Sequence, residues 1–214
     1  MMKSFVLLVL ALPASYAGAE SIVGNGGDVV VCRDANREIR SVELLDYVEA
    51  RLRGWEVTEA VASDAEIVTA RMMIQRLAVG LPEESAELDA IAAAFFDNAR
   101  LLPNIDLVDI PDSDHLVLPR GCALEQIAIR RRPGFPSERL YTVNLDLWER
   151  LAPSHRVGLI LHETLYGYFL DKPVTSSSAS ASVRARYLTG LLSRRDFDRI
   201  APIDQADEPG PHAA

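Results

Sequence analysis

The chain has 214 residues, of which 49% are hydrophobic and 25% are charged, so it is long enough to bury a core without metal or covalent staples. Its 31 acidic residues outnumber its 22 basic ones, which gives a formal net charge of −9. Because nucleic acids and anionic lipid surfaces repel such a chain, we expect no nucleic-acid partner and no membrane partner for the mature protein. Composition leaves the actual partner unknown.

Residues 1–19 have the pattern of a secretory signal peptide. Lys3 precedes an apolar run at 5–12, and small residues end in an Ala-x-Ala cleavage site at 17–19. The run is too short to span a bilayer. We therefore expect a periplasmic or secreted protein, with one globular domain over 20–200 and a disordered tail over 201–214.

Two cysteines, Cys32 and Cys122, remain after the signal peptide. In an oxidising compartment such a pair most simply forms one disulfide, and the absence of a Cys-x-x-Cys spacing argues against a redox-active pair. The bond is expected to tie the N-terminal strand to the middle of the chain. Because it closes a loop of nearly 90 residues, it is expected to stabilise the fold considerably.

A glycine-rich stretch, Gly-Asn-Gly-Gly-Asp at 24–28, precedes a β-branched run at 29–32 that predicts a buried strand. Its glycines allow positive φ and close backbone approach, and successive N–H groups there can form an anion nest. The stretch is either a structural loop or a loop that lines a site. In the second case Asn25 and Asp28 are ligand-lining residues.

Hydrophobic periodicity predicts both helices and strands, in separate parts of the chain. Helices are expected at 42–53, 63–79, 83–99 and, after Asn144 as N-cap, 145–151. Strands are expected at 39–42, 105–110, 116–118, 123–131 and 139–143. The basic run at 130–132 is expected to be the solvated end of a strand. These elements predict an α+β fold with a small antiparallel sheet packed with several helices.

Residues 155–170 predict a mostly buried helix with Ser154 as its N-cap. Apolar residues recur along it at helical spacing. This helix carries His162 and Glu163 side by side. Burying a carboxylate beside an imidazole requires a specific neutralising group from elsewhere in the chain.

Residues 162–166 read His-Glu-Thr-Leu-Tyr and resemble the zincin metallopeptidase motif His-Glu-x-x-His, with tyrosine in place of the second histidine. The resemblance implies that His162 ligates zinc, that Glu163 is the general base, and that Tyr166 is a weak ligand or oxyanion donor. It also makes a zincin-like layout possible. A catalytic zinc takes three protein ligands, however, and His155 lies about 10 Å earlier along the helix.

The next predicted helix, 179–193, contains no His, Asp or Glu. It offers Ser182 and Arg186, whose donors suit hydrogen bonding to a carboxylate such as Glu163 better than they suit a metal ion. We therefore expect a buried cluster in which Arg186 neutralises Glu163 and Ser182 lines any ligand cleft.

Several short stretches together resemble a set of small exported bacterial proteins. They are the Gly-Asn-Gly-Gly-Asp stretch, residues 41–47, 121–122 and 185–188, and the Leu-His-Glu of the helix at 161–163. The resemblance spans most of the mature chain and implies one domain without implying a mechanism.

Three functions are compatible with these patterns. The first is a non-catalytic exported domain with a buried cluster of His162, Glu163, Tyr166 and Arg186. The alternative is a zinc-dependent, peptidase-like hydrolase with a degenerate motif, for which zinc is the one cofactor to consider. An inhibitor or immunity-like partner protein is the third. The sequence leaves open whether the protein is an enzyme.

Overall fold

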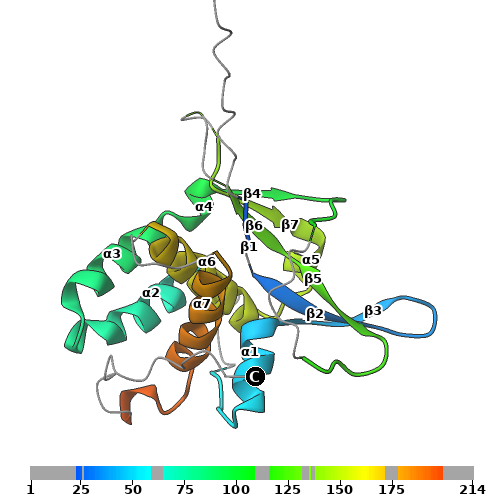
Figure 1. Ribbon diagram of the computed structural model, residues 1–214, viewed down its shortest axis with the longest axis horizontal. Coiled ribbons are helices and arrows are strands. Elements are labelled where there is room, and N and C mark those ends of the chain that lie inside the picture. The colour runs from blue at the N-terminus through cyan, green and yellow to red at the C-terminus, as the bar shows by residue number, and fades with distance from the viewer. Residues whose placement is uncertain are drawn as a thin grey trace, which may run out of the picture.

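The computed structural model describes residues 23–25, 27–58, 65–108, 116–131, 135, 138–171 and 178–199. The fold is α+β, as predicted, with helices α2, α3, α6 and α7 gathered on one side of the view in Figure 1 and most strands on the other. The predicted signal peptide and C-terminal tail lie outside the described residues.

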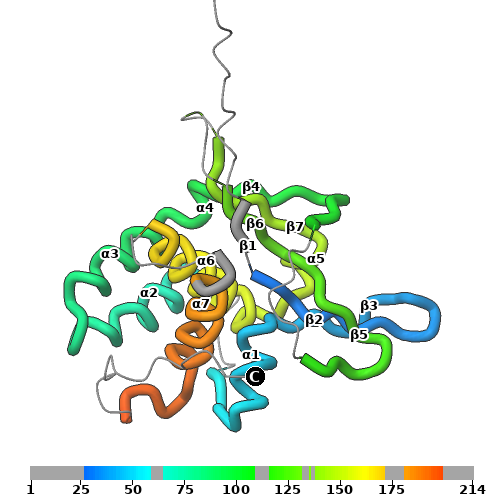
Figure 2. Tube along the Cα trace, viewed as in Figure 1, coloured from blue at the N-terminus to red at the C-terminus, as the bar shows by residue number. Residues whose placement is uncertain are grey.

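Two small sheets make up the β part. The first has the order β1-β6-β7-β4 and the second β3-β2-β5. The strands are β1 (Val23–Asn25), β2 (Asp28–Arg33), β3 (Ile39–Leu44), β4 (Ala99–Leu102), β5 (Cys122–Gln126), β6 (Ala128–Arg131) and β7 (Tyr141–Asn144). All strand pairs are antiparallel except β4 with β7, which is parallel. The β2–β3 hairpin extends away from the helices, as Figure 2 shows.

The helices follow the predicted order with different ends. They are α1 (Leu45–Leu52), α2 (Glu66–Gln75), η1 (Arg76–Val79), α3 (Pro82–Ala93), α4 (Phe95–Asn98), α5 (Leu145–Arg150), α6 (Pro153–Asp171), α7 (Ser178–Leu192) and η2 (Phe197–Arg199). The pattern predicted one helix over 83–99, but the chain turns at Ala94 and enters β4 at Ala99.

Helix α6 is the centre of the fold, in contact with α1, α2, α3, α7 and β3 (Figure 1). Every residue from 157 to 167 is buried, which is the behaviour of a helix that is surrounded by other elements on all sides. Gly158 allows the closest of these contacts. A Cβ there would lie 2.5 Å from Leu44 Cδ2 and 2.8 Å from Tyr47 Cζ, so a side chain would push α6 away from α1.

The strands predicted at 29–32 and 39–42 are present as the β2–β3 hairpin. The strand predictions for the middle of the chain were wrong. Residues 105–108 form no strand; Leu107 makes an isolated bridge to Gln126. The predicted strand 123–131 is two strands in two different sheets, separated at Ile127. Ile127 is fully buried between the two strands. Its N–H donates to the C=O of Gly27, and its C=O accepts the N–H of Asn144, so one residue links both sheets to the glycine-rich stretch.

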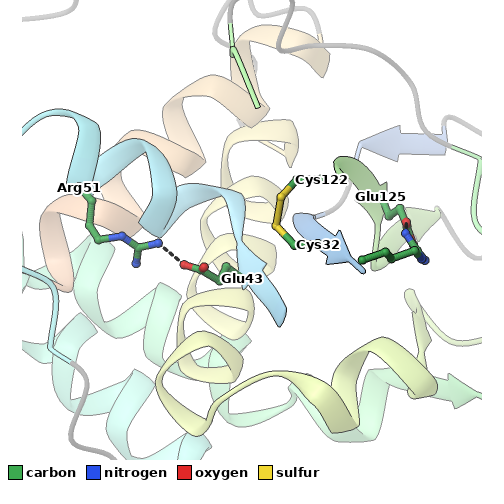
Figure 3. Close-up of a disulfide and its surroundings, with 6 residues drawn as sticks. Cys32, Glu43, Arg51, Cys122 and Glu125 are labelled. Carbon is green, nitrogen blue, oxygen red and sulfur yellow. Dashed lines mark hydrogen bonds and ion pairs between the residues drawn. A yellow bond between two sulfur atoms is a disulfide. The ribbon is translucent and has the colours of Figure 1, made fainter. Parts of the chain in front are cut away.

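The predicted disulfide between Cys32 and Cys122 is confirmed. The two residues are directly opposite each other on β2 and β5, with an S–S distance of 2.00 Å (Figure 3). The bond joins positions 90 residues apart in the sequence. Disulfides of this kind persist in oxidising compartments. No helix within the described ranges is long and apolar enough to cross a membrane.

Candidate functional site

His162 and Glu163 point to two different sides of α6. Neighbouring residues on an α-helix are about 100° apart, so one faces α1 and the other faces the start of β2. Both side chains are buried, with only 1% of His162 and 0% of Glu163 exposed. The site therefore consists of two half-sites, each of which is completed by a different element.

The His162 half-site is completed by Asp46 on α1. The imidazole Nδ1 lies 2.9 Å from Oδ2 of Asp46, and the Asp46 side chain is fully buried. Burial alone lowers the pKa of His162, but the charge of Asp46 and its hydrogen bond outweigh burial and raise the pKa to about 9. His162 is accordingly an imidazolium at neutral pH, paired with a carboxylate.

The Glu163 half-site is completed by the backbone of the glycine-rich stretch. The N–H of Gly27 donates to Oε1 of Glu163 at 2.7 Å. Burial raises the pKa of Glu163, against the opposing effects of His162, the Gly27 N–H and Arg130. The carboxyl group thus holds the start of β2 against α6.

Gly27 must be glycine at this contact. A Cβ at this position would lie 2.2 Å from Cδ1 of Leu159, which is fully buried, so Leu159 would have to shift within the packed core. Since the N–H of Gly27 is bonded to Glu163, that donor is not available to an anionic ligand. Asp28 is buried at the start of β2, and Asn25 pairs with Ile129 through the β1–β6 ladder.

Arg186 and Ser182 lie on α7, as expected, but the structure gives Arg186 a different carboxylate. Its Nε lies 3.4 Å from Oε1 of Glu49, and its Nη1 donates to Ser182 Oγ at 3.1 Å. The arginine whose charge acts on Glu163 is Arg130 on β6. Arg186 thus pairs with Glu49, and the arginine charge that acts on Glu163 comes from Arg130.

Arg130 was expected in solvent and is instead buried. Only 8% of its side chain is exposed, and its Nη2 lies 2.9 Å from Oδ2 of Asp171 at the end of α6. The guanidinium lies against Gly167, where a Cβ would come within 3.1 Å of Nε. Tyr141 is close by, and burial, with the charge of Glu163, raises its pKa to about 12.

Tyr166, the residue in the place of the second zincin histidine, is fully buried one turn after His162. The two rings are 6.0 Å apart between centroids and tilted by 36°. The phenol ring therefore packs beside the imidazole on the buried surface of α6. Tyr166 is part of the hydrophobic core around α6, and His162 is buried beside it.

The residues present do not fit a catalytic zinc. Among the residues that the structure describes, no group of three His, Cys, Asp or Glu is placed to hold a metal ion. His162 uses Nδ1 for Asp46, which leaves Nε2 as a single metal-binding atom. Within the described part of the chain, neither Nε2 of His162 nor Oε2 of Glu163 has a hydrogen-bond partner.

Three members of the site were not predicted from the sequence. Asp46, Gly27 and Arg130 lie far from α6 in the sequence, at separations of 116 residues for Asp46 and 136 for Gly27. One local signal was present for Asp46, because an acidic residue between Leu45 and Tyr47 interrupts an apolar run. Nothing local distinguishes Arg130 from its neighbours in the basic run.

No protein-family model, curated protein or solved structure matches this chain.

Proposed function

We propose that the protein is a non-catalytic exported domain in which the residues around His162 and Glu163 hold α6 to α1 and to the start of β2. One observation carries this proposal. Both side chains are buried, and each is bonded to a group of the same chain, Asp46 for His162 and the Gly27 N–H for Glu163. A general base must reach the proton that it removes, within hydrogen-bond distance or through one water molecule.

Export to the periplasm or the medium is part of the proposal. The pattern at 1–19 supports it, and so does the disulfide between Cys32 and Cys122. A disulfide-bonded domain suits an oxidising compartment of this kind. Its function then depends on what its surface binds.

A zinc-dependent hydrolase is the second candidate, favoured by one specific feature. Zinc-bound histidines commonly donate their other ring N–H to a carboxylate, which is the relation between His162 Nδ1 and Asp46. Among the residues that the structure describes, no second and third ligand is placed beside His162, which opposes this candidate.

Metal analysis separates the two candidates. The mature protein, purified without chelator, is dialysed against excess zinc and then against buffer, and bound zinc is measured by mass spectrometry. The non-catalytic domain retains no stoichiometric zinc. One equivalent that is retained by the wild type, kept in His155→Gln and lost in His162→Gln would contradict the proposal and support the hydrolase.

A further inference from the structure

A pocket of about 410 Å³ lies where the segment after α1 meets the end of α7. Its lining residues are Arg51, Gly54, Trp55, Glu56, Val57 and Arg195. Small-molecule sites typically measure about 300 to 1,000 Å³, so the volume suits a small ligand. None of these residues belongs to the His162 and Glu163 half-sites, and the pocket is therefore independent of the site described above.

Backbone hydrogen bonds fix the walls of this pocket. The N–H of Thr58 donates to the C=O of Ser193 at 2.8 Å, and the N–H of Arg195 donates to the C=O of Glu56 at 3.0 Å. Val57 and Arg194 form the antiparallel bridge between these two bonds. The two segments behave as a short piece of sheet, which holds the pocket in shape without a ligand.

Trp55 forms the apolar wall and is itself held on several sides. Its indole packs near Gly190 of α7, where a Cβ would lie 3.5 Å from the ring. The ring of Tyr187 meets it edge-on at 5.3 Å between centroids, and the guanidinium carbons of Arg53 and Arg194 lie 5.7 and 5.1 Å from its centroid. These contacts keep the indole in one orientation.

The two arginines that line the pocket have partners that a ligand can replace. Arg51 points to Glu43 on β3, as Figure 3 shows, and both side chains are 39% exposed. Arg195 lies 3.8 Å from Glu56, with 62% and 80% of these side chains exposed. Ion pairs in such exposed positions contribute little to stability, so exchanging a glutamate for a ligand anion has a low energetic cost.

We propose that this pocket binds a small organic anion. Arg51 and Arg195 bind its carboxylate or phosphate group, and Trp55 and Val57 contact its apolar part. The net charge of −9 favours a small anion over a polyanion, because repulsion by the whole molecule grows with the charge of the ligand. The site would give the non-catalytic domain a ligand to bind.

The test uses tryptophan fluorescence of the mature protein. The chain has two tryptophans, so Trp148→Phe leaves Trp55 as the only reporter. Four probes are titrated: benzoate, phenyl phosphate, the neutral benzamide and the ring-free acetate. We expect a saturable change with benzoate or phenyl phosphate and at least about tenfold weaker binding of benzamide and acetate, a ratio that corresponds to about 1.4 kcal/mol. Comparison of benzoate with phenyl phosphate identifies the preferred anionic group.

Matched arginine variants complete the test. Arg195→Ala is expected to weaken binding of the better probe at least about fivefold, because it removes one charged partner of the anion. Arg150→Ala removes an exposed arginine of α5 and should leave binding unchanged. The proposal is overturned if no probe gives a saturable change, if benzamide binds as well as benzoate and phenyl phosphate do, or if the two variants behave alike.

Discussion

At the scale of single residues, the buried polar groups of His162 and Glu163 are tolerated because each is bonded to a group from another part of the chain. Removing one partner of a buried ion pair costs several kcal/mol, since the remaining charge has lost both water and its neutralising group. Asp46 supplies that partner for His162, and the Gly27 N–H and Arg130 act on Glu163. The groups that act on His162 and Glu163 thus come from α1, from β6 and from the residue before β2.

Two substitutions of Glu163 should differ sharply in their effect. In Glu163→Gln the amide oxygen can still accept the Gly27 N–H, and residue 163 carries no charge, so the free energy of unfolding at pH 7 should stay within about 1 kcal/mol of the wild type. Glu163→Ala leaves that N–H unsatisfied beside a cavity and should lose about 2 to 4 kcal/mol. Urea unfolding followed by circular dichroism measures both values.

The exposed Glu83→Ala on α3 is the control for this comparison and should change stability by less than about 0.5 kcal/mol. Equal losses in Glu163→Gln and Glu163→Ala would mean that the carboxyl group does more than accept the Gly27 N–H.

At the scale of elements, the sequence predicted what depends on local pattern. Asn144 accepts the Leu147 N–H at 3.1 Å and caps α5 as expected, and α6 lies within two residues of its predicted ends. Strand positions depend on pairing partners that are distant in sequence. β4 forms at 99–102, where it lies beside β7, although the alternation is clearer at 105–110.

For the site, too, the sequence predicted the local features and not the partners that are distant in sequence. The buried helix and its His162-Glu163 pair follow from the apolar residues around them. The choice of partner does not, because it depends on which backbone comes within hydrogen-bond distance. Arg186 lies on the neighbouring helix with the chemistry to bind Glu163, yet Glu49 on α1 is its carboxylate partner.

The close contact of Gly27 with Leu159, between the start of β2 and α6, can be tested by substitution. Gly27→Ala should lower the free energy of unfolding by about 1 to 3 kcal/mol, because its methyl group would overlap Cδ1 of Leu159. Leu159→Ala removes that atom. In the Leu159→Ala background, Gly27→Ala should therefore have almost no further effect, and the double-mutant cycle should give a coupling above about 1 kcal/mol. Purely additive losses would show that the two residues are not in close contact.

At the scale of the whole molecule, the disulfide joins parts of the second sheet that are far apart in sequence. β5 follows a long segment with little regular structure among its described residues, and Cys122 fixes it to Cys32 on β2. A bond that closes a loop of this length restricts the unfolded chain strongly. The stability of the fold is therefore expected to depend on oxidation of these two cysteines.

Replacing both cysteines tests this dependence. The variant Cys32→Ala with Cys122→Ala should lose about 2 to 5 kcal/mol of unfolding free energy. Reduced wild-type protein should show a similar loss in the same urea titration. A variant as stable as the oxidised wild type would mean that the β2–β5 ladder alone holds the second sheet together.

The pairing of His162 with Asp46 makes the stability of the protein depend on pH. Because the pKa of His162 rises from 6.5 to about 9 on folding, the native state binds more protons than the unfolded state between these values. The stabilisation is complete below pH 6.5 and is lost as the pH rises through 9. It amounts to about 3 kcal/mol, from about 1.4 kcal/mol for each pH unit.

Urea titration of the wild type and of Asp46→Asn from pH 6 to pH 10 measures how far the free energy of unfolding depends on the pairing of His162 with Asp46. If a buried imidazolium is held by Asp46, the wild type should lose about 3 kcal/mol over this range and Asp46→Asn, although less stable at pH 6, should lose much less. A wild type with a flat profile, or an Asp46→Asn profile as steep as that of the wild type, would show that Asp46 does not hold a buried imidazolium.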